Sequence, residues 1–171
     1  MASTFTSARA AAGVQPFKMH GDGLLHAAYG SIEILVNPVV NDVYEMCKLP
    51  AGAVVVGGFF YMDDIDTDST ETIDFDVGWP ANGGSDDFDS ADQDGLGNLG
   101  VMDGDASTLP NLFNAVGIQI VLPSPHFGDG DLPFFSAETM IQLKAIAVCA
   151  TFTAGAVSVV VLYVVDESLV A

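Results

Sequence analysis

The chain has 171 residues, 50% of them apolar, with 23 Asp and Glu against 4 Lys and Arg, and a formal net charge of -19 at pH 7. This length suits one domain with a real core, and the apolar content excludes an acidic disordered chain. No Lys or Arg stands between Lys48 and Lys144, so we expect no binding to nucleic acid or to an anionic membrane, because both require cations.

An N-terminal arm is predicted for residues 1–26, which are dominated by Ala, Ser, Thr and Gly. Arg9 and Lys18 are two of the four cations, and Phe17 offers an apolar anchor. A slightly basic arm on an acidic body favours contact with another chain, and a frayed terminus is the alternative. Arg9, Phe17 and Lys18 are therefore candidate partner-binding residues. Residues 1–13 lack the apolar core of a secretory signal, so we expect synthesis in a cytoplasm.

Residues 27–171 are punctuated by turns like an all-β protein and are expected to form one domain. Alternation begins with Ile32, Ile34 and Val36 against Ser31, Glu33 and Leu35. Gly57 and Gly58 lie inside a later strand and indicate a β-bulge or a close backbone approach. The predicted strands after the first alternation are Val43–Leu49, Ala53–Met62, Glu71–Trp79, Val116–Leu122, Thr139–Val148 and Val157–Val165.

Two of these strands carry the fold prediction. In the strand Glu71–Trp79, one face is expected to be buried and the other to be acidic and exposed to solvent. The buried face is apolar and is formed by Ile73, Phe75, Val77 and Trp79. The strand Val157–Val165 is apolar on both faces, so it is either central in a sandwich or covered by another subunit. The strands and short turns together predict an antiparallel β-sandwich of jelly-roll type.

A long acidic loop, rich in Gly and Asp, is predicted as an insert over residues 80–110. Asp89, Asp92 and Asp94 are candidate calcium ligands within it, together with Asp86 and Asp87, because hard cations bind several carboxylates on a flexible loop. An EF-hand is excluded, since Ser90 and Val101 stand where its first and last acidic ligands belong. A solvated acidic loop without calcium is the alternative, and no cofactor is assigned.

Catalytic chemistry is not indicated by the remaining side chains. Cys47 and Cys149 sit in apolar strands and are interpreted as buried thiols without a disulfide. There is no nucleophile-elbow serine and no phosphate-binding glycine loop. The three histidines, His20, His26 and His126, have no cysteine near them in sequence. We therefore expect that the protein is not an enzyme.

One stretch carries a family resemblance. Residues 45–58 form a strand, a Leu-Pro-Ala-Gly turn and a second strand, followed by an aromatic strand, an Asp-rich turn and the strand Thr72–Trp79. With the Asp/Gly-rich insert and the closing strand, this pattern resembles capsid decoration (cement) proteins and other small head-associated virion proteins of tailed bacteriophages. The resemblance covers residues 27–165 and brings no catalytic residues.

The resemblance implies a structural protein that binds and stabilises the outer surface of a capsid. The implied partners are the major capsid protein and two further copies in a homotrimer, with assembly in a host cytoplasm. Acidity that keeps a protein away from packaged DNA agrees with that location. Two alternatives stay open: a tail or fibre component, and a calcium-dependent β-sandwich module that binds a carbohydrate or receptor.

Overall fold

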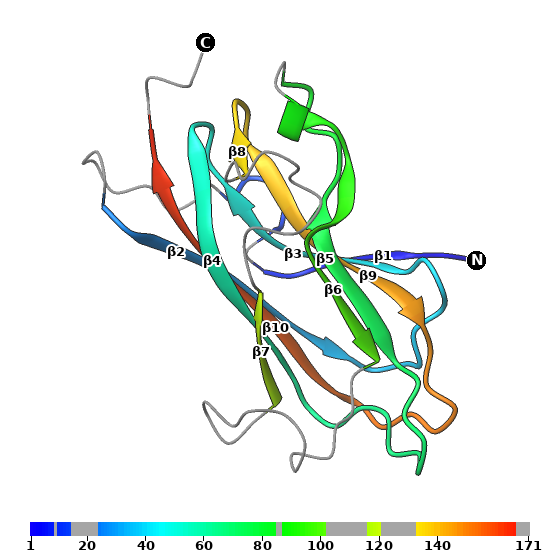
Figure 1. Ribbon diagram of the computed structural model, residues 1–171. Coiled ribbons are helices and arrows are strands. Elements are labelled where there is room, and N and C mark those ends of the chain that lie inside the picture. The colour runs from blue at the N-terminus through cyan, green and yellow to red at the C-terminus, as the bar shows by residue number, and fades with distance from the viewer. Residues whose placement is uncertain (9, 15–23, 85–86, 102–115, 121–132, 167–171) are drawn as a thin grey trace.

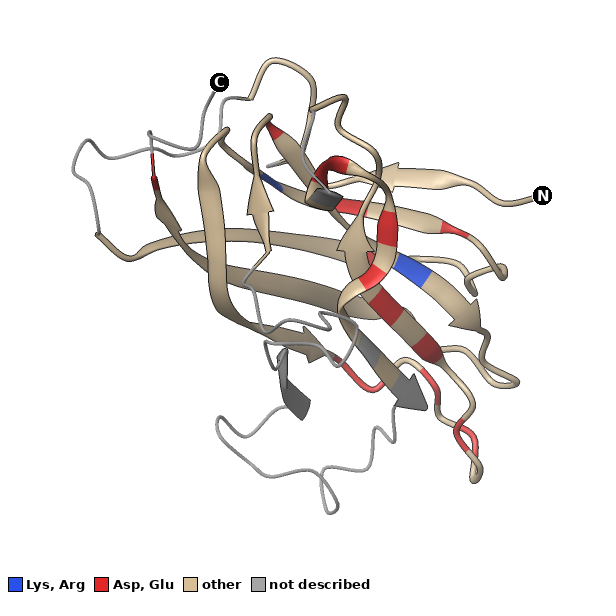
Figure 2. Ribbon diagram, turned by 45° about the horizontal axis from the view of Figure 1, so that its top comes forward, with Lys and Arg blue, Asp and Glu red and all other residues tan. Residues whose placement is uncertain are grey.

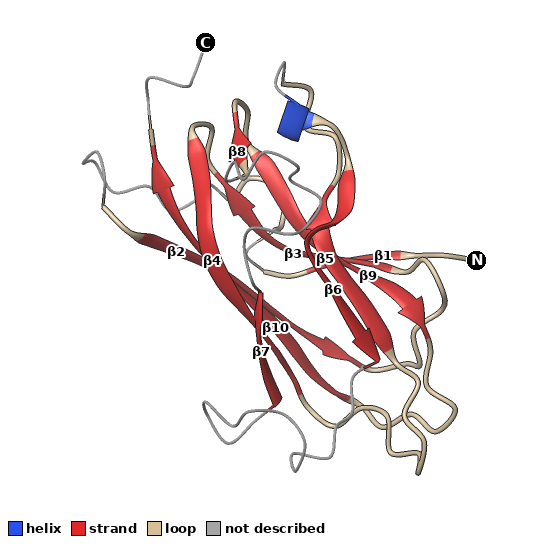
Figure 3. Cartoon of the chain, in the orientation of Figure 1, coloured by secondary structure: helices blue, strands red, loops and turns tan. Residues whose placement is uncertain are grey.

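The computed structural model describes residues 1–8, 10–14, 24–84, 87–101, 116–120 and 133–166. Within them the chain forms β-strands and one short 3-10 helix, η1 (Figures 1 and 3). The elements are β1 (Thr4–Thr6), β2 (His26–Ile34), β3 (Val43–Leu49), β4 (Ala53–Met62), β5 (Asp74–Trp79), η1 (Asp87–Asp89), β6 (Asp92–Val101), β7 (Val116–Ile120), β8 (Phe134–Phe135), β9 (Thr139–Ala147) and β10 (Gly155–Val165).

Two sheets pack face to face. One has the order β1-β3-β9-β5-β6, and the other has the order β2-β10-β4-β7, with β8 also paired to β4. All strand pairs are antiparallel except β1 with β3, which is parallel. The β-sandwich prediction is confirmed. The order, in which β2 and β3, β4 and β5, β6 and β7, and β9 and β10 lie in opposite sheets, favours the jelly-roll type.

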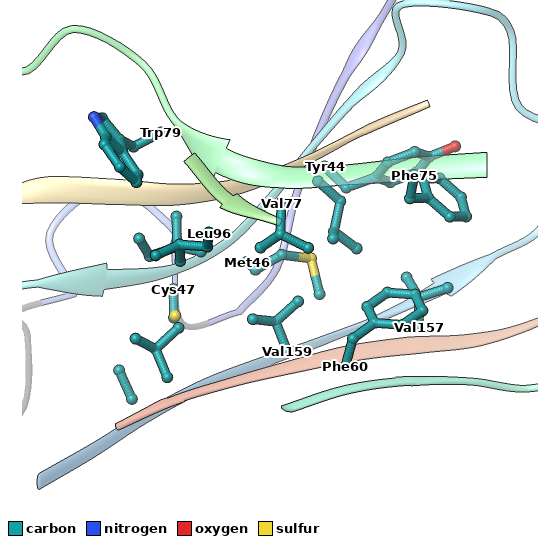
Figure 4. Close-up of a cluster of buried hydrophobic side chains, with 14 of the residues drawn as sticks. Tyr44, Met46, Cys47, Phe60, Phe75, Val77, Trp79, Leu96, Val157 and Val159 are labelled. Carbon is teal, nitrogen blue, oxygen red and sulfur yellow. The ribbon is translucent and has the colours of Figure 1, made fainter. Parts of the chain in front are cut away.

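The core lies between the sheets and, within the described residues, is built mainly from the inward rows of β3, β4, β5, β9 and β10 (Figure 4). The predicted apolar face of β5 is buried as expected, with Phe75 and Val77 fully inaccessible to solvent. Trp79 packs edge-on against Phe135 at a ring separation of 4.9 Å, and its indole N–H donates to the carbonyl of Ser90 at 2.9 Å. Such aromatic pairs add to the free energy gained by burial itself.

The strand β10 lies between β2 and β4. A central position in the sandwich, which was one of the two predicted explanations for its apolar faces, is therefore what the structure has. Its inward row is buried, whereas its outward row, which includes Val160 and Leu162, is half-buried. The bulge predicted near Gly57 is present, because the pairing of β4 with β10 shifts register between Leu162 and Tyr163.

The insert is a correction to the sequence analysis. Residues 92–101 form β6, which pairs with β5, rather than part of one long loop. Leu96 is buried in the core, and Gly95 packs so closely that a Cβ there would clash with the Trp79 ring. The edge of β5 supplies the hydrogen-bonding partner, which outweighs the low strand propensity of Gly and Asp. Residues 102–110 lie outside the described part of the chain.

The first residues of the predicted arm are a second correction, because they pack on their own body. β1 extends the sheet at the edge of β3, and Phe5 stacks on Tyr44 at 4.9 Å. The Ser3 amide donates to a carboxylate oxygen of Asp42 at 2.6 Å, and the Ser7 hydroxyl donates to the carbonyl of Met46. Thr4–Thr6 is therefore an edge strand of the sandwich, which covers backbone groups of β3 that would otherwise face solvent.

Both cysteines are buried free thiols, as predicted. Burial raises the pKa of Cys47 to about 12. Burial, and to a smaller degree the nearby Asp66 carboxylate, raises the pKa of Cys149 to about 11. Among the described residues there is no helix with the length and apolarity that a membrane span needs.

Candidate functional site

The outward surface of β9, β5 and β6 is acidic, and we call it the acidic face, formed by Asp74, Asp76, Asp94 and Lys144. Asp76 pairs in register with Lys144 of β9, and Asp74 lies two residues away on the same side of β5. In Figure 2 acidic residues are gathered on this sheet and on the loops at its ends. The single lysine leaves an excess of negative charge on this face.

The outer side of β5 was expected to be exposed to solvent, but this is wrong for Asp76, which is only 8% exposed. β5 is an interior strand, flanked by both β9 and β6, which leaves less of its outer side open to solvent than an edge strand would have. Burial raises the pKa of Asp76 to about 6, helped by the charges of Asp74 and Asp94 and opposed by Lys144. One carboxylate oxygen each of Asp74 and Asp76 is buried without a hydrogen-bond partner in the described part of the chain.

The candidate calcium ligands do not converge in the described structure. Asp89 is buried, and its carboxylate accepts hydrogen bonds from the Asn82 amide at 2.6 Å and from the Ser136 hydroxyl. Asp92 and Asp94 lie at the start of β6, where Asp92 pairs with Trp79. No group of three or more His, Cys, Asp or Glu within the described residues is placed to hold a metal ion. The acidic side chains of residues 86 and 87 lie outside the described part, so calcium binding stays an untested prediction.

The outward surface of β2, β10 and β4 differs sharply from the acidic face. It is formed by the half-buried and exposed side chains of Tyr29, Val54, Val56, Phe59, Tyr61, Val160, Leu162 and Val164, and we call it the apolar face. Tyr29, Val160 and Phe59 stand side by side in one row across the three strands.

These three strands carry one acid, Glu33, and no Lys or Arg, and Figure 2 shows them tan along nearly all their length. Adjacent apolar side chains on a sheet surface make this face a candidate for contact with another macromolecule. On the apolar face, two strongly acidic molecules could come into contact without bringing like charges together.

The predicted partner-binding residues Arg9, Phe17 and Lys18 all lie outside the described residues, so their role stays a prediction. A surface that the sequence analysis missed is the connection between β2 and β3. Val36 was expected to continue the first strand, but β2 ends at Ile34 and Val36 is 62% exposed. The Asn37-Pro38 pair is the signal that marks this end, because a residue before proline disfavours regular continuation and the pair favours a turn.

The sequence matches no protein-family model and no curated protein. Solved structures of similar fold come from bacteriophage capsids. A chain in the structure "Capsid of Ralstonia phage GP4" superposes with a TM-score of 0.70 at 22% identity, over 96% of this chain and 99% of that one.

Two further matches come from the "Cyanophage Pam1 capsid asymmetric unit" and the "Acidic stable capsid structure of Helicobacter pylori bacteriophage KHP30". The cyanophage chain gives a TM-score of 0.54 at 22% identity, over 89% of this chain and 93% of that one. The Helicobacter phage chain gives 0.53 at 14% identity, over 85% and 90%. The resemblance to phage virion proteins is thus confirmed at the level of the fold.

Proposed function

We propose that the protein is a structural virion protein that binds the outer surface of a tailed-phage capsid and stabilises the shell. The observation that carries this proposal is the end-to-end superposition on a chain of the Ralstonia phage capsid structure, since nearly all of both chains takes part. All three matching chains come from capsid structures, which favours a head protein over a tail or fibre component.

The two unlike faces support the same role. A protein on the outside of the shell contacts other proteins through apolar surface and turns its acids toward solvent, which is the division between the apolar face and the acidic face. The excess of negative charge opposes contact with the DNA inside. The major capsid protein is the proposed partner, and assembly in the host cytoplasm follows from that partnership.

A homotrimer is the proposed state on the capsid. Copies with a net charge of -19 repel one another, so a stable contact between them has to be largely apolar. The apolar face around Val160 and Leu162 meets that requirement, and a closed symmetric assembly covers it without leaving an open-ended surface. Arg9, Phe17 and Lys18 add a second contact, with the cations meeting acids of a neighbouring chain.

Particles that lack this protein test the proposal. They should package genomes normally but release DNA at a lower temperature and break more readily under osmotic shock, and added purified protein should restore their stability. Gold or antibody labelling of intact particles should reach the protein from outside. Mutant particles that are as stable as the wild type, or labelling confined to tails, would refute the decoration role.

A calcium-dependent binding module is not favoured by a specific observation. One of its candidate ligands, the buried Asp89, already accepts hydrogen bonds from Asn82 and Ser136.

A further inference from the structure

The connection between β2 and β3 exposes four aliphatic side chains in six residues. Leu35 is 71% exposed, Val36 62%, Val39 47% and Val40 45%. We call residues 35–40 the apolar loop. It contains no charged residue, in a chain whose net charge is -19. Single exposed aliphatic residues are ordinary on protein surfaces, but a contiguous group of them marks an interaction site.

The apolar loop is held in one conformation from both sides. The Asn37 side-chain amide donates to the carbonyl of Cys149 at 2.8 Å, which ties the loop to the connection between β9 and β10. A carboxylate oxygen of the buried Asp42 accepts the amide of Val39 at 2.8 Å, and the Asp42 amide donates back to the Val39 carbonyl at 2.8 Å. Pro38 between them is buried.

These hydrogen bonds hold the apolar loop away from the rest of the protein, so its aliphatic side chains stay exposed. Asn41 closes the loop with a left-handed backbone, φ 72°, and its amide donates to the carbonyl of Ala145 at 2.8 Å. A loop that is already ordered loses little conformational entropy when it binds, so most of the free energy of burying its side chains is available to the complex.

An acidic turn lies at the same end of the sandwich. Residues 63–72 connect β4 to β5 and pack on the connection between β9 and β10, the segment that also holds Asn37. The Thr67 amide donates to the carbonyl of Thr151 at 3.0 Å, and Asp66 forms a β-bridge with Phe152. Asp63 and Asp64 of this turn are exposed. One end of the molecule therefore presents an aliphatic tip beside exposed carboxylates.

This combination selects the kind of partner. A second copy docked through the same end would bring its own acidic turn against the first, and like charges in close contact cost several kcal/mol. An anionic membrane is disfavoured for the same reason. A protein surface with an aliphatic depression could bury the apolar loop. Lysine or arginine at the border of that depression could pair with the carboxylates of the acidic turn.

We propose that the apolar loop inserts into an aliphatic depression, bordered by Lys or Arg, on the protein that forms the capsid shell. The identity of this partner rests on the proposed function. The apolar face is left available for contact between copies, so the two surfaces serve different partners.

The test measures binding to shells of the major capsid protein assembled without this protein, by co-sedimentation of purified variants. The double variant Leu35→Ser with Val36→Ser removes the two most exposed side chains and should weaken binding roughly tenfold or more. Leu25→Ser is the matched control, since Leu25 is also strongly exposed, at 62%, and stands at the opposite end of β2. The control should bind within about twofold of the wild type.

A third variant tests the basic border. Asp64→Asn should weaken binding about twofold or more at ~0.05 M salt, and the difference should vanish at ~0.5 M salt, where screening is short-ranged. All these variants should melt within ~2 °C of the wild type, because the altered side chains face solvent. If the double variant melts lower than that, Val40→Asp replaces it, since a charge among the exposed aliphatic side chains of the apolar loop should also weaken docking.

The outcomes separate the two proposals. If wild type binds the shells and the double variant and Val40→Asp bind equally well, the inference is overturned while the proposed function stands. Equal losses of binding affinity in the double variant and in Leu25→Ser also overturn the inference, because binding then depends on exposed apolar surface in general and not on the apolar loop. If wild type does not bind the shells, the proposed function and its partner both fail. Flotation of the wild type with neutral phosphatidylcholine vesicles, lost in the double variant, would assign the loop to a membrane and overturn the inference.

Discussion

Replacing Gly30 with alanine should strongly destabilise the sandwich, because the backbone of β3 at Met46 approaches β2 closely there. Gly30 lies on the inward side of β2, and a Cβ at this position would stand 2.9 Å from the Cα of Met46 and nearer still to its carbonyl carbon and oxygen. Real Cβ atoms stay beyond 3.0 Å of such neighbours. The clashing atoms are backbone, so rotation of a side chain cannot relieve the contact.

The expected cost follows from what must move. Met46 lies at the register shift between β3 and β9, and its carbonyl also accepts the Ser7 hydroxyl, so a retreat of β3 disturbs the docking of β1. Overpacking against a backbone that resists movement costs about 3 kcal/mol. For a chain of this size each kcal/mol lowers the melting temperature by ~2–4 °C, so Gly30→Ala should melt ~6–12 °C below the wild type.

Gly57→Ala is the matched control, since Gly57 lies in the same sheet and a Cβ there would meet nothing within 4 Å. Alanine at that position should leave stability unchanged or raise it by up to ~1 kcal/mol, by restricting the unfolded chain. Both variants are compared by circular dichroism melting. A Gly30→Ala protein that melts within ~2 °C of the wild type would refute the reasoning about this contact.

Asp76→Asn should melt higher than the wild type at pH 8, and this gap should shrink as pH falls below 6 and close near pH 3.8. The pKa of Asp76 is raised from 3.8 to about 6 in the folded protein, so the wild type loses stability as pH rises through that range; a gap that does not change with pH would contradict this. Removing residues 1–8 should lower the melting temperature of the purified protein, because Phe5 no longer covers Tyr44, and an unchanged melting curve would restore the interpretation of these residues as a detached arm. Asp89→Ala should cost roughly 1–2 kcal/mol by leaving its half-buried partners Asn82 and Ser136 without their acceptor. Calcium, compared with chelator at fixed ionic strength, should not shift the wild-type melting curve, whereas a clear rise would show that the acidic insert binds the ion.

The strands that the sequence predicted well are those whose alternation coincides with the boundary between core and solvent. β3 and β4 begin and end where predicted, and the inward row of β5 through Phe75 and Val77 is buried. In such strands the side chains alternate between the two faces because of local backbone geometry, and burial of apolar surface selects which face turns to the core. Both effects can be recognised from residues close together in the sequence.

The elements that the sequence did not predict depend on partners far along the chain. β1 is polar and short, and it is ordered by hydrogen bonds to β3 residues 39 positions away, such as Thr6 to Glu45. β6 contains little but Asp, Gly and Asn around Leu96 and Leu99, so only the exposed edge of β5 makes it a strand. The burial of Asp76 likewise depends on which strands flank β5, which alternation alone does not specify.

The two buried thiols have a consequence for the proposed role on a phage particle, which would be built inside a cell and then released. A thiol reacts with oxidants and with other sulfur compounds as its thiolate, and the raised pKa values of Cys47 and Cys149 keep both in the protonated form at neutral pH. Their exposed fractions of 2% and 4% also deny access to dissolved reagents. A particle coated with this protein would pass from the reducing interior of a bacterium into aerated water without crosslinking or chemical ageing at its cysteines.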